Sequence, residues 1–284
     1  MKCGTSSLHR YLDLHPEIGM SATKELNYFL PVDAGSAAGS AEATEAGLLA
    51  ERSNRGRGRR WYESQFDDAP IRGESSVAYS FPWFPGVAET MAAELDDPRF
   101  VYVVRNPVER MLSHRHQFIR RDTRPTPDAL LDENGPYLQA TLYATALQPF
   151  LGQFDRERVL IVDQARLRHE REDVLTEILG FLGLDPEPVV SSPHLAQEWN
   201  VTASKGRAFQ IAERVRSSGP GAAIAARLPR QLQTQAAEAL RRDPADIEDD
   251  DLSAEQSARL LALLEPEIAG LEELTGWDLS DWRA

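Results

Sequence analysis

Met1-Lys2-Cys3-Gly4-Thr5-Ser6-Ser7-Leu8 opens the sequence, and the rest of the chain can be arranged around it. Gly4 permits a tight turn, and the hydroxyls of Thr5, Ser6 and Ser7 follow at the start of an amphipathic helix. The N–H groups at a helix start and the helix macrodipole favour negative charge, and Lys2 adds a mobile cation. The stretch therefore predicts an anion-binding turn. The same residues also make a good helix N-cap, so by itself the stretch leaves a purely structural role open.

The order of residues in this turn differs from the loop that binds nucleoside triphosphates. That loop has the pattern GxxxxGK[ST], in which the lysine follows the glycines. In this chain Lys2 comes before Gly4. The difference points away from ATP and GTP as ligands.

Length and composition favour one large folded unit. With 284 residues and 42% hydrophobic content the chain can form one α/β domain or two small ones, and we expect a single domain over residues 1–284. Cys3 is the one cysteine, which excludes an internal disulfide framework and suits a reducing compartment; we expect it to serve packing or the loop backbone. The sequence has no apolar run of membrane-spanning length and no hydrophobic signal segment, so we expect a cytoplasmic protein without a transmembrane segment.

The net charge of −14 argues against nucleic acid as a partner, but the charge is uneven along the chain. From Arg241 to the end there are 13 Asp and Glu against 4 Arg, which is typical of a solvated helical face. Residues 105 to 124 instead hold six arginines and two histidines. An acidic protein can therefore still carry a basic anion pocket.

Predicted strands alternate with predicted helices. Apolar runs predict strands at 18–20, 99–104 and 158–162, and residues 71–79 resemble a strand that ends in a polar turn. Helical patterns occupy residues 86–95, 137–154, 172–182, 208–242 and 252–275. The continuous apolar runs at 99–104 and 158–162 are typical of parallel strands buried on both faces. The alternation indicates an α/β fold with three layers, in which helices flank a mostly parallel, doubly wound sheet.

Two polar segments near the start have open roles. In Lys24-Glu25, directly before the aromatic cluster that ends at Phe29, the carboxylate is a candidate general base, although a surface ion pair would look the same. Residues 31–60 have no hydrophobic period and predict a long loop or lid. The run Arg55 to Arg60 within it either touches an anionic acceptor or is an ordinary solvated basic loop, which we favour.

Further cations follow at the ends of later elements. Arg105 comes at the carboxyl end of the strand at 99–104, and a helix that begins near Pro107 carries Ser113. Ligands of open α/β sheets bind outside the carboxyl ends of the strands, and arginine binds phosphate oxygens bidentately. A polar loop with two cations around a glycine, Ser204-Lys205-Gly206-Arg207, comes later. With the opening turn, these segments describe a ligand with two separated phosphate-like groups.

At these residues the sequence resembles the sulfotransferases that use 3′-phosphoadenosine 5′-phosphosulfate (PAPS), especially the glycosaminoglycan-type and related bacterial branch. That family has a Lys-x-Gly-Thr-[Thr/Ser]-Ser/Ala-Leu loop, matched by Lys2 to Leu8, and an Arg-[Asn/Asp]-Pro-x-Glu-Arg-x-x-Ser segment, matched by Arg105 to Ser113. The resemblance covers most of residues 2 to 207. Its further matches are His15-Pro16, Lys24 to Phe29, Gly73 to Tyr79 and Lys205 to Arg207.

The resemblance implies a P-loop-like sulfotransferase fold and a role for each matched residue. The loop of Lys2, Cys3, Gly4, Thr5, Ser6 and Ser7 would hold the 5′-phosphosulfate, Arg105 and Ser113 the 3′-phosphate, and Ser204 to Arg207 would also contact PAPS. Lys2 would stabilise the leaving oxygens, and Glu25 would be the general base. Histidine is the base in cytosolic small-molecule sulfotransferases, but we expect His114 and His116 to lie on a helix surface. No metal is implied, because a sulfuryl group carries less negative charge than a phosphoryl group.

The sequence departs from the family pattern at two points. In the family an apolar strand precedes the phosphosulfate loop, and this sequence begins one residue before Lys2, so we expect the first strand to be missing or truncated. Ser75 stands where some glycosaminoglycan members have lysine, which argues against a heparan-type acceptor. Carbohydrate, lipid-linked sugar and natural-product acceptors stay open, as does the oligomeric state. The regions expected to contact the acceptor are 31–60 and 114–136.

Two other functions stay open from the sequence. A P-loop-type small-molecule kinase would need the GxxxxGK[ST] loop, which the opening turn lacks, and would consume ATP with magnesium. A non-catalytic nucleotide-binding paralogue would bind the donor without sulfating any acceptor. With labelled PAPS, a sulfotransferase would transfer the label to an acceptor, whereas neither of these two proteins would do so.

Overall fold

The described part of the chain contains two pairs of parallel strands. β1 (Ile18–Met20) pairs with β2 (Ile71–Gly73). β3 (Phe100–Val104) pairs with β4 (Val159–Asp163), so that Phe100 lies opposite Val159. Each pair is a separate two-stranded sheet, and both pairs are parallel. The predicted α/β fold with parallel strands and flanking helices is confirmed.

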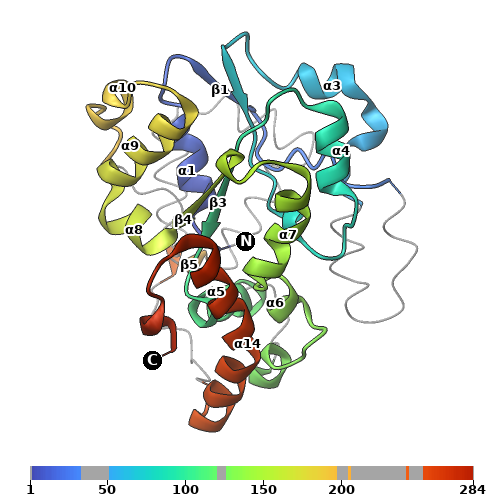
Figure 1. Cartoon of the computed structure of the whole chain (residues 1–284), viewed down its shortest axis with the longest axis vertical. Coiled ribbons are helices and arrows are strands. Elements are labelled where there is room, and N and C mark those ends of the chain that lie inside the picture. Colours follow the sequence, from blue (N-terminus) through green and yellow to red (C-terminus); the bar gives the residue numbers. More distant parts are fainter. Residues whose placement is uncertain are drawn as a thin grey trace. The chain divides into compact units, whose positions relative to one another are not determined.

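The computed structural model describes residues 2–32, 51–119, 126–196, 204–205, 241–242 and 252–283 (Figure 1). The chain divides into two units, one of residues 1–114, 126–199 and 252–284 and the other of residues 115–125 and 200–251. In the second unit, β5 (Ser204–Lys205) pairs antiparallel with β6 (Arg241–Arg242). The helix predicted over 208–242 is therefore wrong at its last two residues, and residues 206–240 lie outside the described part.

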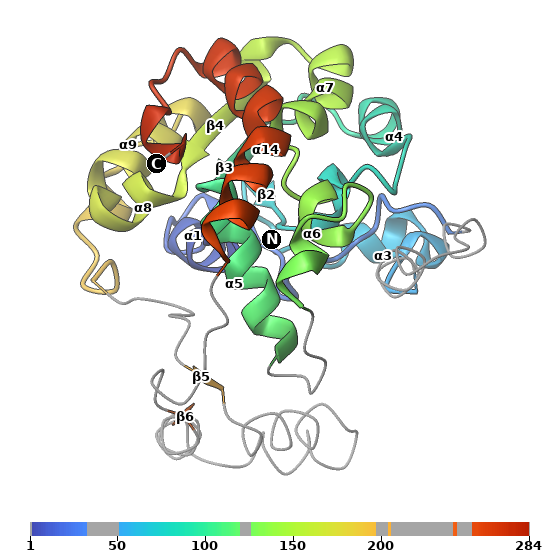
Figure 2. The ribbon, with the colours of Figure 1, turned by 90° about the horizontal axis from the view of Figure 1, so that it is seen from below.

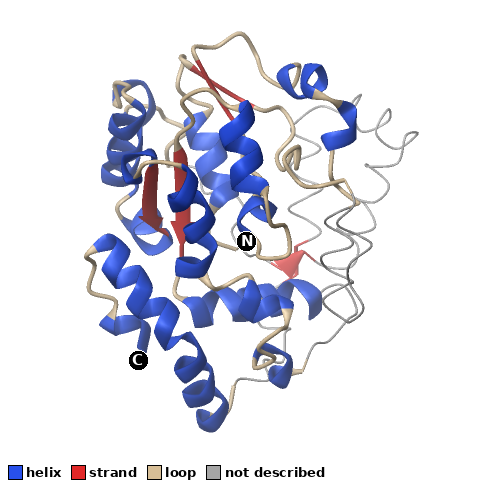
Figure 3. Cartoon of the chain, turned by 45° about the vertical axis from the view of Figure 1, so that its right-hand side comes forward, coloured by secondary structure: helices blue, strands red, loops and turns tan. Residues whose placement is uncertain are grey.

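Helices flank the strand pairs of the first unit, as Figure 3 shows for β3 and β4. α8 and α9 pack against β4, and α1 packs against β1. α7 packs against both α4 and α14 (Figure 2). The helices described in the chain are α1 (Thr5–Leu12), α3 (Arg59–Glu63), α4 (Val87–Glu94), α5 (Pro107–Ile119), α6 (Pro136–Gln139), α7 (Tyr143–Gln153), α8 (Gln164–His169), α9 (Arg171–Leu182), α10 (Glu187–Val190) and α14 (Ala254–Thr275).

The helix predicted over 137–154 is two helices, and a buried arginine binds a backbone carbonyl of the first one, close to the break. The Tyr137 carbonyl accepts hydrogen bonds from Arg110 Nη1 at 2.7 Å and from Thr141 Oγ1 at 2.6 Å. The Thr141 N–H donates instead to the Leu138 carbonyl at 2.8 Å, a tighter turn than an α-helix makes. α6 therefore ends at Gln139, and α7 begins at Tyr143.

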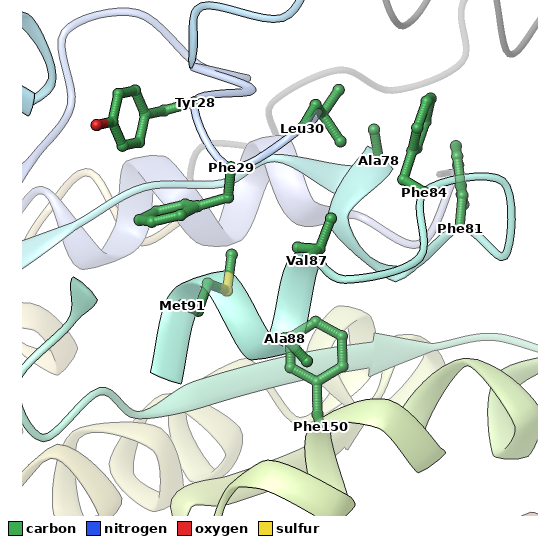
Figure 4. Packing of buried hydrophobic residues seen from close by; sticks show 10 residues of the cluster. All are labelled: Tyr28, Phe29, Leu30, Ala78, Phe81, Phe84, Val87, Ala88, Met91 and Phe150. Carbon is green, nitrogen blue, oxygen red and sulfur yellow. The ribbon is translucent and has the colours of Figure 1, made fainter. Parts of the chain in front are cut away.

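An aromatic cluster lies beside the segment that follows β1 (Figure 4). Tyr28 and Phe29 pack edge to face, with ring centroids 5.0 Å apart, and Tyr28 stacks on Tyr62 at 4.5 Å. Aromatic pairs of this kind stabilise a core beyond the area that they bury. The buried members of the cluster are Tyr28, Phe29, Leu30, Ala78, Phe81, Phe84, Val87, Ala88, Met91 and Phe150.

Candidate active site

Gly4 forms the turn that starts α1. Its φ of +82° lies in the left-handed region, where a side chain is disfavoured, and its carbonyl accepts from the N–H groups of Ser7 at 2.9 Å and Leu8 at 3.1 Å. No side-chain hydrogen bond caps this helix. Gly4 is itself the N-cap residue, so the structural role that the sequence leaves open is filled by the glycine rather than by the hydroxyls of Thr5 or Ser6. The turn presents a helix N-terminus, the arrangement that suits an anion.

Arg105 and Lys2 bring the two predicted anion-binding segments together. Arg105 Nη1 donates to the Lys2 carbonyl at 3.4 Å, and the same guanidinium pairs with Glu109 Oε2 at 2.8 Å. On the other side, a Cβ at Gly4 would lie 3.5 Å from Gln164 Cγ. Arg105 follows β3 and Gln164 follows β4, so the turn lies at the carboxyl ends of both strands. Figure 1 shows the chain's N-terminus beside this end of β3.

Ser113 lies on α5 and is buried, 8% exposed. The start of this helix is fixed by Asn106, whose Oδ1 accepts from the N–H groups of Val108 at 3.0 Å and Glu109 at 3.2 Å. An asparagine in this position satisfies N–H groups that have no partner within the helix. Ser113 is thereby carried on α5, and Arg105 directly precedes the asparagine that caps this helix.

Glu25 lies in the loop after β1 with a left-handed backbone, at φ +64°. Its N–H donates to the Ser75 carbonyl at 3.0 Å, and Lys24 Nζ lies 3.0 Å from its Oε1. The side chains of Lys24 and Glu25 are 24% and 35% exposed, so the ion pair contributes little to stability. The carboxylate is accessible, as a general base has to be.

His9 is a residue of this region to which the sequence analysis gave no role. Its Nδ1 lies 3.0 Å from Ser75 Oγ, so Ser75 contacts both α1 and the backbone of Glu25. Burial lowers the pKa of His9, and the nearby charge of Lys24 lowers it further. A neutral imidazole is therefore favoured beside Lys24. The signal that could have revealed His9 is its place one turn after Thr5, on the helix that carries the anion-binding turn.

The expectation that His114 lies on a helix surface is wrong. His114 is 1% exposed, and its Nδ1 lies 2.8 Å from Nη2 of Arg110, which is itself completely buried. Its ring packs edge to face against Tyr137, with centroids 4.9 Å apart. His114 thus belongs to the buried group beside the break between α6 and α7. His116 lies on α5, and its side chain is outside the described part.

The basic run is exposed to solvent at residues 56–60, in agreement with the interpretation that we favour, but Arg55 itself is half-buried and anchored. Arg55 Nη1 donates to Glu94 Oε2 at 2.8 Å, and its guanidinium lies over the Tyr28 ring at 4.9 Å. Arg57 lies over the ring of Trp61 at 4.3 Å. The run forms a 3-10 turn, Arg55–Arg57, and the start of α3. Residues 33–50 of the predicted lid lie outside the described part.

The last predicted binding segment belongs to the second unit. Ser204 and Lys205 form β5, opposite Arg242 and Arg241, where we expected a polar loop. Gly206 and Arg207 lie outside the described residues. The contribution of Ser204 to Arg207 to donor binding stays a prediction.

Within the described ranges no cluster of three or more His, Cys, Asp or Glu residues has the arrangement of a metal site. In the same ranges no helix combines the length and the apolar character of a membrane span.

Cys3 is buried, and its Sγ lies 3.7 Å from Tyr143 Oη, in agreement with the packing role expected of it.

Comparisons with known proteins agree on one family. The profile of the Sulfotransferase family matches residues 1–188. "Membrane-associated sulfotransferase kil1" of Dictyostelium discoideum is 26% identical over 132 residues, which are 44% of this chain and only 23% of that relative's length. The crystal structure of a sulfotransferase from Alicyclobacillus acidocaldarius has a TM-score of 0.65 and 23% identity, covering 100% of this chain and 95% of that one. A sulfotransferase domain from the curacin biosynthetic pathway covers 71% of this chain and 76% of its own, with a TM-score of 0.43 and 18% identity.

Proposed function

Because the chain belongs to the sulfotransferase family, we propose that it transfers a sulfuryl group from PAPS to a hydroxyl or amine of an acceptor. The observation that carries the proposal is the hydrogen bond from Arg105 to the Lys2 carbonyl. This contact and the proximity of Gly4 to Gln164 support the proposal, because the carboxyl ends of β3 and β4 are where α/β proteins bind ligands. A ligand with phosphate groups at both ends suits such a pair of cationic segments.

The proposed donor site is made of the opening turn and the start of α5. Lys2, Cys3, Gly4, Thr5, Ser6 and Ser7 would hold the phosphosulfate through backbone N–H groups, hydroxyls and the lysine ammonium, while Arg105 and Ser113 would hold the 3′-phosphate. These donor groups fit the ligand, because α1 lacks a side-chain cap and Gly4 adopts the backbone that only glycine adopts without strain. We include Ser204, Lys205, Gly206 and Arg207 as further contacts.

When bound, PAPS supplies the activated sulfuryl group, and the residues of the chain position it and stabilise charge. Lys2 stabilises the negative charge that grows on the leaving phosphate oxygen as its bond to sulfur breaks. Glu25 takes the proton of the acceptor as the acceptor oxygen or nitrogen bonds to sulfur. The products are the sulfated acceptor and adenosine 3′,5′-bisphosphate. General-base help of this kind contributes about 10²- to 10⁴-fold in rate.

The composition of the sequence and the identity of residue 75 bear on the compartment and on the class of acceptor. Cys3 is the one cysteine of the sequence, and from this we propose that the protein acts in the cytoplasm. The acidic composition makes a small molecule or saccharide a better acceptor than a nucleic acid. Ser75, whose hydroxyl contacts His9, stands where some glycosaminoglycan-type members have lysine, and this favours acceptors other than heparan-type chains.

The proposal is tested with PAPS that carries a radiolabelled sulfuryl group. The purified chain is mixed with a panel of phenols, alkyl glycosides, long-chain alcohols and amines, and labelled products are separated. Transfer to at least one class, with stoichiometric release of adenosine 3′,5′-bisphosphate, is expected. A parallel mixture with ATP and magnesium tests for a kinase. Phosphorylation of an acceptor without sulfation, or calorimetry that detects no binding of adenosine 3′,5′-bisphosphate, would contradict the proposal.

A further inference from the structure

The segment that carries Glu25 is held by the neighbouring segment 74–79 through alternate backbone N–H groups. The N–H of Glu25 donates to the Ser75 carbonyl at 3.0 Å. Two residues on, the N–H of Asn27 donates to Ser76 Oγ at 3.0 Å. After two more, the N–H of Phe29 donates to Tyr79 Oη at 3.4 Å. Two of these three acceptors are side-chain hydroxyls, whose orientation is not fixed by the backbone.

Glu74 fixes the orientation of both hydroxyls. Its Oε2 lies 2.6 Å from Ser76 Oγ, and its Oε1 lies 2.9 Å from Tyr79 Oη. A backbone N–H can only donate, so each hydroxyl accepts from the backbone with a lone pair and gives its own hydrogen to the carboxylate. The two oxygens of one carboxylate thus direct two hydroxyls, and each hydroxyl accepts from one residue of the Glu25 segment.

The Glu25 segment needs such support because its backbone is strained. Glu25 has φ +64° and Asn27 has φ +51°, both in the left-handed region that residues other than glycine seldom occupy. Conformations of this kind persist only where the surrounding structure enforces them. Asn27 is 3% exposed, so no solvent competes for its N–H, and the Ser76 hydroxyl is the partner that keeps it in place.

We propose that Glu74 is a positioning residue, which orients Ser76 and Tyr79 so that they hold residues 25–29 and aim the carboxylate of Glu25 at the acceptor. The inference rests on the proposed function, in which Glu25 is the base. It assigns to the glutamate of the Gly73-Glu74 motif a role that acts through hydrogen bonds rather than through contact with substrate.

The free-energy cost of burying the Glu74 carboxylate supports a functional role for this residue. Burial raises the pKa of Glu74, although hydrogen bonds from Ser76, Tyr79 and Tyr62 oppose the change. Ionising this carboxyl therefore costs stability, and buried ionisable groups with shifted pKa values are common at functional sites. Glutamine in its place would offer one acceptor and one donor. The hydroxyl that faced the amide nitrogen would then meet two donors and have no acceptor for its own hydrogen.

The first readout is kinetic and uses Glu74→Gln with radiolabelled PAPS and the acceptor from the panel that reacts fastest. We expect kcat to fall about 10- to 100-fold, as for a misplaced catalytic group, with the Kd of adenosine 3′,5′-bisphosphate within about twofold of wild type. In a Glu25→Gln background, Glu74→Gln should lower kcat no further. An independent, multiplying loss in the double variant would overturn the inference.

The second readout is hydrogen–deuterium exchange, which needs no acceptor. Peptides that span residues 25–29 should exchange faster in Glu74→Gln than in wild type. The matched control is Glu267→Gln on α14, where Oε2 accepts from the Thr145 N–H at 3.1 Å and Oε1 from its hydroxyl. This variant should change neither kcat nor exchange at residues 25–29. Tyr79→Phe removes only one hydroxyl and gives the same readouts if Glu74→Gln fails to fold.

The outcomes separate this inference from the proposed function. Unchanged exchange at residues 25–29 would overturn the positioning role whatever the enzyme activity. Faster exchange with unchanged kcat would overturn the link to catalysis. A wild-type chain that binds no adenosine 3′,5′-bisphosphate would instead sink the proposed function, and the exchange data would still decide whether Glu74 holds the segment.

Discussion

Arg105 donates a hydrogen bond to the Lys2 carbonyl over 3.4 Å, although 103 positions separate the two residues in the sequence. The contact joins the turn before α1 to the end of β3. It uses the carbonyl of Lys2 and Nη1 of Arg105, while Nε and Nη2 of Arg105 donate to Glu109 Oε2, so a donor phosphate would have to compete with Glu109 for this guanidinium. Arg105 thus has both a structural and a proposed binding role.

Replacing Arg105 with alanine should weaken donor binding. A charged hydrogen bond contributes about 1.5–3 kcal/mol, so the Kd of adenosine 3′,5′-bisphosphate should rise about 10- to 100-fold. Isothermal titration calorimetry measures the change. Arg283→Ala is the control, because that guanidinium pairs with Glu265 at 3.0 Å and Glu272 at 2.8 Å and is not part of the proposed site. Equal affinities for Arg105→Ala and wild type would remove Arg105 from the donor site.

Replacing Glu25 with glutamine should abolish most transfer but leave donor binding intact. The amide keeps the shape of the side chain and cannot take the acceptor proton, so kcat should fall by about 10²-fold or more. Steady-state assays with labelled PAPS provide the rate, and calorimetry provides the Kd. Glu63→Gln, which removes a surface partner of Arg59, should behave as wild type. Near-normal turnover of a folded Glu25→Gln variant would assign the base elsewhere.

Gly4→Ala should destabilise the fold as well as the turn. At φ +82° a Cβ costs about 1–2 kcal/mol, and the free energy of unfolding in urea should fall by that amount. Gly152→Ala is the matched control in α7, where a Cβ would meet nothing within 4 Å, and alanine should stabilise the helix by about 0.5–1 kcal/mol. Opposite signs for the two variants are the expected result, and equal stabilities would contradict the assigned backbone of Gly4.

Comparing wild type with Glu74→Gln across pH should reveal the elevated pKa of Glu74. Because the folded-state pKa lies above the unfolded value, this carboxyl contributes stability that is fully present below the unfolded pKa, about 4.3, and is lost as pH rises through the folded pKa. The stability of wild type relative to Glu74→Gln should therefore decrease as pH rises from about 4 toward neutrality. Urea titrations at a series of pH values measure the difference. A difference that grows with pH would mean that the pKa is lowered instead.

The sequence predicts the elements that are determined by their own residues. It misses features that depend on contacts with residues far away in the sequence. β3 and β4 are continuous apolar runs, because both faces of each strand are buried, and this leaves a visible pattern. The break between α6 and α7 lies beside Arg110, which comes from α5 and leaves no signal in residues 137–154. The pairing of Arg55 with Glu94 is equally invisible, since a basic loop and a basic anchor have the same composition.

The candidate site divides in the same way. Lys2 and Arg105 stand in motifs with fixed spacing, so the sequence predicts that both serve one ligand, but the hydrogen bond between them is seen only in the structure. The contacts of His9 with Ser75 and of Glu74 with Ser76 and Tyr79 depend on side chains that meet only after folding. A motif gives the identity of such residues, but the direction of each hydrogen bond needs the three-dimensional structure.

The two contacts of Ser75 have a mechanical consequence. Its hydroxyl contacts His9 on α1, and its carbonyl accepts from the N–H of Glu25. The helix that follows the proposed donor turn and the loop that carries the proposed base are therefore both bound to one residue. Thermal fluctuations that shift α1 would carry the backbone of Glu25 with them. The distance between the proposed donor turn and the proposed base would then vary less than the position of either.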